Sequence, residues 1–181
     1  MKTENLRLIT PCEEYLNSYI EAYNEDVNFR AGMDECLCPP ETVIETACQY
    51  RNGIDLPPER VPSSMLWLVT DNEFIGCTDI RHYLTDRLLL SDGHIGYEVR
   101  FSKWNKGYGT KLLALSLQYA KENFHFDKVL VTCDEDNFAS ARVIEKNGGI
   151  WENTIETIDD DGRKRMTKRY WINFLSQIVE K

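Results

Sequence analysis

The stretch of this chain best suited to chemistry is a basic, glycine-containing segment near its middle. No acidic residue lies between Glu98 and Glu122, although the chain contains 30 acidic and 21 basic residues. The same segment holds the run KGYGT at 106–110, between a predicted strand and a predicted helix. Glycine lets the backbone approach a ligand closely, and free N–H groups at a helix start attract phosphate. The segment therefore indicates a phosphate-containing ligand, although an ordinary glycine turn with solvated lysines has the same residues.

Two familiar phosphate-binding motifs are excluded by their spacing. A P-loop requires Gly-x-x-x-x-Gly-Lys-Ser/Thr, but Gly109 is followed by Thr110 and Lys111 with no glycine in the required place. A dinucleotide fingerprint requires a third glycine where this chain has Leu112, and it belongs in an alternating βαβ array. Neither motif fits.

The elements that must position this segment follow from hydrophobic periodicity. Strands are predicted at 6–10, 65–70, 74–83, 95–100, 128–133, 150–158 and 165–174. Helices are predicted from Tyr15 through Tyr23, from after Pro40 to just before Asn52, over 107–124 and over 137–147. Residues 53–64 contain three prolines and a glycine and predict a loop. This order of elements predicts one α/β (α+β) domain over residues 1–181 with a mixed sheet.

Two motifs, in register with these elements, resemble the Gcn5-related N-acetyltransferase (GNAT) superfamily. The stretch VRFSKWNKGYGT at 99–110 is similar to the family's coenzyme A loop, Q/R-x-x-G-x-G/A after a strand. The stretch NFASARVIEKNGG at 137–149 resembles its second signature, N-x-x-A/S followed by E-K-x-G-F/G. The order of elements agrees as well. The resemblance implies a mixed, mostly antiparallel central sheet flanked by helices, with the acceptor-side helices and loop at about 11–64.

Three positions depart from the family pattern. Trp104 stands where the family usually has Gln or Arg, and Phe101 stands where a proline is common. Ile144 occupies the position of a tyrosine that often serves as general acid to the leaving thiolate. That acid is therefore absent from this chain or supplied by another residue.

The resemblance implies acetyl-CoA as cosubstrate and assigns roles to particular residues. Backbone groups of Val99 and Phe101 would hold the pantetheine arm, and the N–H of Val99 would donate to the developing oxyanion. The pyrophosphate would be held by the backbone N–H groups of Asn105, Lys106, Gly107, Tyr108, Gly109 and Thr110. Asn137 would hydrogen-bond the pantetheine arm, with Ser140 close to it. Asn137 is equally suited to be a helix N-cap.

Acetyl transfer to an amine also requires removal of a proton, because a free alkylammonium has a pKa near ~10.4. Glu98, in the strand run GYEV, is the first candidate for the catalytic base, since it lies beside the expected thioester. His94 has the same strand parity and is the second candidate, acting alone or through water. A surface carboxylate in an ion pair and a surface imidazole are the simpler interpretations of both residues.

The composition of the chain limits the classes of partner that it is expected to bind. The net charge of −9 disfavours general attraction to nucleic acid or to an anionic membrane and favours cationic substrates such as amines. The six cysteines predict reduced thiols, and the spacing Cys36-Leu37-Cys38 does not fit a zinc site, so no metal is expected. The charged start and the lack of an apolar run of ~18 residues predict a soluble, cytoplasmic protein.

The leading hypothesis is an acetyl-CoA-dependent N-acetyltransferase that acts on a primary amine of a small molecule or peptide. The alternative is a non-catalytic acyl-CoA-binding sensor module, which the missing tyrosine leaves open. A third hypothesis, nucleic-acid binding, depends only on a basic cluster around the last hairpin, at 163–169. The expected partner is the amine, with no nucleic acid and no membrane. The sequence leaves open whether the chain forms a homodimer.

Overall fold

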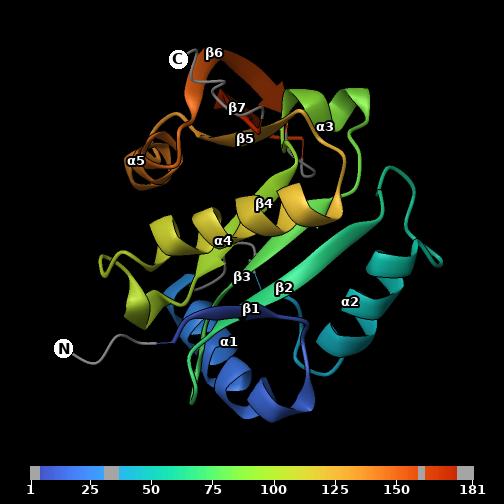
Figure 1. The fold of residues 1–181 in the computed structure, drawn as a ribbon, viewed down its shortest axis with the longest axis vertical. Coiled ribbons are helices and arrows are strands. Elements are labelled where there is room, and N and C mark those ends of the chain that lie inside the picture. Colours follow the sequence, from blue (N-terminus) through green and yellow to red (C-terminus); the bar gives the residue numbers. More distant parts are fainter. Residues whose placement is uncertain (1–4, 31–36, 159–161, 175–181) are drawn as a thin grey trace, which may run out of the picture.

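The computed structural model describes residues 5–30, 37–158 and 162–174 (Figure 1). Its strands are β1 (Arg7–Ile9), β2 (Ser63–Val69), β3 (Phe74–Arg81), β4 (Ile95–Val99), β5 (Lys128–Asp134), β6 (Ile150–Ile158) and β7 (Lys164–Asn173). Its helices are α1 (Leu16–Arg30), α2 (Val43–Asn52), α3 (Asp86–Leu90), α4 (Tyr108–Asn123) and α5 (Phe138–Lys146), with short 3-10 helices η1 (Glu13–Tyr15) and η2 (Phe101–Lys103). Cys36 and part of the predicted acceptor-side loop lie outside the described residues.

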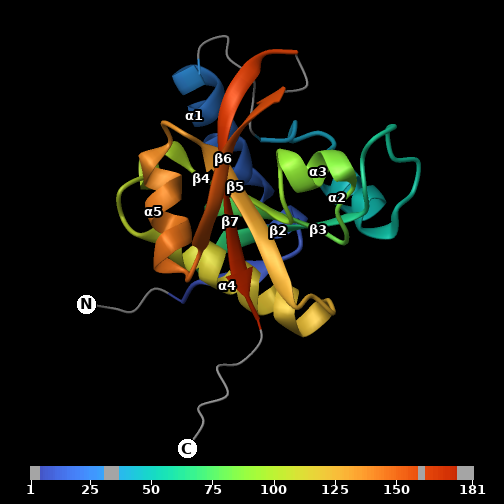
Figure 2. The same ribbon diagram turned by 90° about the horizontal axis from the view of Figure 1, so that it is seen from above.

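The strands form two antiparallel sheets rather than one continuous sheet. The first has the order β1-β2-β3-β4 and the second has the order β5-β7-β6. Figures 1 and 2 show the second sheet at the β4 end of the first, with α4 and α5 packed beside the junction. The prediction of an α/β fold with antiparallel strands flanked by helices is confirmed, and the division into two sheets is what the structure adds.

The two sheets meet at one point between β4 and β5. The N–H of His94 donates to the C=O of Leu130 at 2.7 Å, and the N–H of Leu130 donates to Nδ1 of His94 at 2.9 Å. Gly93 precedes this contact with a positive φ of 65°, and a Cβ there would lie 2.5 Å from the carbonyl oxygen of Leu130. Only glycine allows so close an approach. No ladder joins β4 to β5 within the described residues, so the sheets separate beyond this point.

The two faces of the first sheet carry different helices. Trp67 of β2 stacks on Tyr19 of α1, with ring centroids 4.6 Å apart, in a cluster that also contains Val43 of α2. The next residue, Leu68, packs instead with Leu112 of α4. Because successive strand residues point to opposite faces, α1 and α2 cover one face and α4 covers the other.

Helix α3 was not predicted from the sequence. Its N-cap is Thr85, whose side chain accepts a hydrogen bond from the N–H of Leu88 at 3.3 Å. A threonine followed by aspartate in the first turn is a recognisable helix start. The helix has only five residues, which is too short for hydrophobic periodicity to show.

Candidate active site

The edge of β4 that faces away from β3 is open. The N–H of Arg100 donates to the C=O of Ile75 across the β3–β4 ladder, at 2.9 Å. In an antiparallel ladder the residue beside such a pair directs its own N–H and C=O to the other side. Val99 and, two residues earlier, Tyr97 therefore direct these groups away from β3. In the described part of the chain no strand pairs with this edge beyond His94. Tyr97 was missed by the sequence reasoning, although its parity with Val99 indicated it.

A cavity of about 230 Å³ lies at this edge, where β4 and β5 separate. Its lining includes Ile95, Gly96 and Tyr97 of β4, Cys133 of β5, and Asn137 and Ser140 at the start of α5. The motif at 137–149 and the strand at 95–99 are thus brought together by the fold. A small molecule or the reactive end of a larger one fits a space of this size.

Two hydroxyl groups meet in this cavity. The phenol oxygen of Tyr97 lies 2.8 Å from Oγ of Ser140. Burial raises the pKa of Tyr97 to about 12, against a smaller opposing effect of its hydrogen bond to Ser140. Burial likewise raises the pKa of the Cys133 thiol to about 11. Both groups therefore stay protonated at neutral pH.

Asn137 is the N-cap of α5. Its Oδ1 accepts a hydrogen bond from the N–H of Ser140 at 3.0 Å. The capping interpretation of this residue is confirmed, and a contact of Asn137 with a pantetheine arm stays a prediction. Ile144, at the position of the missing tyrosine, is fully buried and has no polar atom to offer the cavity.

The start of α4 presents free backbone donors. Gly107 is its N-cap with a φ of 83°, and no side chain caps the helix. The first N–H groups of an uncapped helix have no intrahelical partner and lie at the positive end of its dipole. In this chain they include the N–H groups of Gly109 and Thr110. Left-handed backbone occurs at Asn105 and Gly107, whereas Gly109 lies inside the helix without a positive φ.

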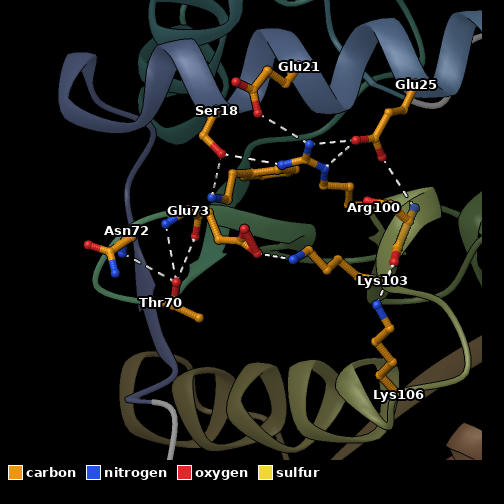
Figure 3. A network of polar contacts seen from close by, with 11 residues as sticks. Ser18, Glu21, Glu25, Thr70, Asn72, Glu73, Arg100, Lys103 and Lys106 are labelled. Atoms are coloured by element: carbon orange, nitrogen blue, oxygen red, sulfur yellow. Dashed lines mark hydrogen bonds and ion pairs between the residues drawn. The ribbon is translucent and has the colours of Figure 1, made fainter.

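Three basic side chains at the start of this segment, those of Arg100, Lys103 and Lys106, contact other groups of the protein (Figure 3). Arg100 forms ion pairs with two carboxylates of α1, and Lys103 forms one with Glu73. Nζ of Lys106 donates to the C=O of Ser102 at 2.9 Å. These three side chains are therefore engaged in contacts within the protein.

Trp104 and Phe101, the two aromatic residues that differ from the family motif, lie beside the open edge of β4. Nε1 of Trp104 donates to the C=O of Val99 at 2.7 Å. Phe101 lies in η2, beyond the end of β4, and its C=O accepts the N–H of Trp104 at 3.1 Å. The carbonyl of Phe101 is therefore already used inside the turn, whereas the N–H of Val99 faces the open edge.

The two candidate bases lie in different surroundings. His94 is buried, and its Nδ1 accepts the Leu130 N–H, so a neutral ring carries its proton on Nε2. Burial, helped by the charge of Arg81, lowers the pKa of His94 to about 4. Glu98 lies opposite Cys77 in the ladder and is half-buried. Because it alternates with Tyr97, its side chain is on the face that α1 and α2 cover.

Several basic side chains of the last hairpin form ion pairs with acidic side chains. Lys164 pairs with Glu156 at 2.8 Å, Arg165 with Asp134 at 3.4 Å, and Arg169 with Glu152 at 2.8 Å. Compensated charges attract phosphate weakly, so the feature behind the nucleic-acid hypothesis is weakened. Over the ranges that the structure describes, no helix has the length and apolar character needed to span a membrane. In the same ranges, no cluster of three or more acidic, histidine or cysteine side chains is arranged to hold a metal ion.

Comparison with known proteins agrees with this geometry. A family model described as an acetyltransferase (GNAT) domain matches residues 5–150, and the chain belongs to this acetyltransferase family. No curated protein matches the sequence.

Three solved structures illustrate the likeness. The microcin C7 self-immunity acetyltransferase, solved with acetyl-CoA and AMP, has a TM-score of 0.70 and 15% identity over 94% of this chain and 93% of that one. The ribosomal L7/L12 α-N-protein acetyltransferase RimL, solved with coenzyme A, has a TM-score of 0.67 and 16% identity over 95% of each chain. Spermidine N-acetyltransferase from Vibrio cholerae, solved with CoA and spermine, has a TM-score of 0.66 and 15% identity over 93% of this chain and 95% of that one. At these identities the likeness shows the fold.

Proposed function

We propose that this chain transfers the acetyl group of acetyl-CoA to a primary amine of a small molecule or peptide, by direct attack of the amine on the thioester. The observation that carries the proposal is the open edge of β4, with the uncapped start of α4 after it and the cavity beside it. Two of the similar structures are enzymes that acetylate amines, one in spermidine and one in a ribosomal protein.

In this proposal the backbone does most of the binding. The N–H groups of Tyr97 and Val99 pair with the pantetheine arm and donate to the thioester oxygen as negative charge develops there. The N–H groups of Tyr108, Gly109 and Thr110 hold the pyrophosphate. Holding the thioester and the amine together supplies a large part of the rate, since well-oriented groups gain ~7–11 kcal/mol over free reactants.

Glu98 is the proposed base. The Nδ1 lone pair of His94 is occupied by the N–H of Leu130 and its Nε2 carries the proton, so the neutral ring has no lone pair left to accept a proton from the amine. Glu98 lies on the face covered by the helices that are expected to bind the acceptor. Its carboxylate would take the ammonium proton, directly or through water.

The Tyr97–Ser140 pair replaces the missing tyrosine in this proposal. Its O–H donates a hydrogen bond to the leaving thiolate. A complete proton transfer from Tyr97 would be unfavourable, because its pKa is about 12 and that of a thiol is ~8.5. The pair therefore stabilises the thiolate by hydrogen bonding, and solvent protonates it after release.

The experiment combines thermal shift with free-thiol release from acetyl-CoA over a panel of amines. Acetyl-CoA at 100 times its Kd should add ~2.7 kcal/mol to the free energy of unfolding, because it binds only the folded state. Thiol release should then depend on the amine. The absence of a thermal shift at millimolar acetyl-CoA would refute the proposal. A shift without thiol release for any amine would favour the sensor module instead.

A further inference from the structure

One carboxylate of α1 holds the turn between β4 and α4. Oε1 of Glu25 accepts hydrogen bonds from Nε and Nη2 of Arg100, at 2.9 and 2.5 Å. Oε2 of the same carboxylate accepts the backbone N–H of Ser102 at 3.2 Å. Figure 3 shows the Arg100 side chain directed toward α1 and away from α4. Glu25 thus binds two residues of the turn at once, from a helix more than seventy positions away in sequence.

All three nitrogens of the Arg100 guanidinium donate to side chains of α1. Its Nη1 donates to Oγ of Ser18 at 3.4 Å, and its Nη2 also contacts Glu21 at 3.3 Å. The sequence places this arginine in a phosphate-binding segment, but the fold uses it to join the segment to α1. Its side chain is only 9% exposed, against 27% for Glu25 and 68% for Glu21. Breaking a pair that is this shielded from water is more disruptive than breaking a surface pair.

A second contact lies one helical turn further along α1. The ring of Phe29 stacks on that of Phe101, with centroids 4.1 Å apart, and meets Trp104 edge to face at 5.3 Å. Glu25 and Phe29 are four positions apart, so they lie on one face of the helix. Trp104 in turn contacts the carbonyl of Val99 on the open edge. Helix α1 therefore contacts four residues of this turn: Arg100, Phe101, Ser102 and Trp104.

We propose that Glu25 is a positioning residue that couples the acceptor-side helix α1 to the coenzyme-binding turn. The proposal depends on the function proposed above for the identity of the ligand. Arg100 directly follows Val99, and Ser102 lies in η2, which leads into the N-terminal cap of α4. Without the carboxylate, the open edge of β4 and the free N–H groups of α4 lose their fixed relation to each other and to α1. Both substrates should therefore bind more weakly.

The test compares Glu25→Gln with Glu21→Gln. Glutamine at 25 keeps the size of the side chain but cannot accept hydrogen bonds at both ends. Glu21 is the matched control, because it lies one turn earlier on α1 and contacts the same guanidinium from an exposed position. The dissociation constant of acetyl-CoA, the KM for the amine and kcat are measured with the melting temperature of each variant.

We expect Glu25→Gln to raise the Kd of acetyl-CoA and the KM of the amine by about tenfold or more, because each binding step must then order the released turn and ~1.4 kcal/mol corresponds to a tenfold change. Glu21→Gln should change both by less than about twofold. In ligand-free protein, hydrogen exchange at the amide of Ser102 should become faster in Glu25→Gln only. A folded Glu25→Gln variant with the Kd and KM of the wild type would overturn the proposal.

Two further comparisons keep the outcome decisive. If Glu25→Gln does not fold, Arg100→Lys gives the same test, because one ammonium group cannot replace the guanidinium fork, and wild-type Kd and KM in it would again refute the coupling. If the wild type binds no acetyl-CoA, the proposed function fails. The exchange rate at Ser102 still decides whether Glu25 holds the turn.

Discussion

His94 offers the sharpest test of the tertiary structure, because it joins the two sheets and cannot be protonated without disturbing that contact. The perturbation is His94→Asn, in which Oδ1 of asparagine can stand near the position of Nδ1 and accept the N–H of Leu130. The variant keeps the acceptor and removes the titrating group. His94→Leu removes both and leaves a buried N–H without a partner, at about 1–3 kcal/mol.

The magnitude follows from the pKa of His94. In the unfolded chain it is near 6.5, whereas burial and then the charge of Arg81 lower it to about 4 in the folded state. The unfolded state therefore binds more protons between these values, so stability is present above pH 6.5 and is lost as the pH falls toward 4. The gap of roughly 2.5 pKa units, at ~1.36 kcal/mol each, corresponds to about 3 kcal/mol, of which about 2 kcal/mol is lost between pH 7 and pH 5.

The assay is urea unfolding of the wild type and both variants from pH 5 to pH 7.5. Other groups contribute the same slope to all three proteins, so the difference between the curves isolates His94. His94→Asn should approach or overtake the wild type by about 2 kcal/mol as the pH falls from 7 to 5. Parallel curves would show that His94 is not buried in the unprotonated form and that the β4–β5 contact has another basis.

Two other predictions concern the proposed chemistry. Glu98→Gln should lower kcat by ~10²–10⁴ with little change in acetyl-CoA affinity, and the loss should shrink at high pH, where more of the amine is neutral. His94→Asn should keep the wild-type pH–rate profile. A larger loss of kcat in His94→Asn than in Glu98→Gln, measured by steady-state kinetics, would make His94 the base. Gly107→Ala and Gly162→Ala each place a side chain at a φ near 80° with open space around it, so each should lower stability by about 1 kcal/mol. Only Gly107→Ala should weaken acetyl-CoA binding in a calorimetric titration, and equal weakening by Gly162→Ala would show that the start of α4 is not the phosphate site.

Most of the secondary structure could be predicted because its periodicity is local. The helix at 107–124 was predicted from apolar residues at helical spacing, and α4 spans Tyr108–Asn123. The strand at 128–133 was predicted from a buried apolar run, and β5 spans Lys128–Asp134. Helix α3 was missed because five residues carry too little periodic signal. The cap of α5 by Asn137 was predictable because capping depends on residues only three positions apart.

The sequence by itself determined the family, and it predicted the segment that would offer backbone donors to a phosphate and the two stretches that would come together around one ligand. These depend on residue types at short spacing, which one chain displays completely. Only the tertiary structure decided which groups in these stretches are already used. Arg100 is bound to Glu25, the carbonyl of Val99 accepts the indole of Trp104, and Nδ1 of His94 accepts the N–H of Leu130. Each of these contacts joins groups whose approach is set by the packing of sheets and helices, so no local pattern records it.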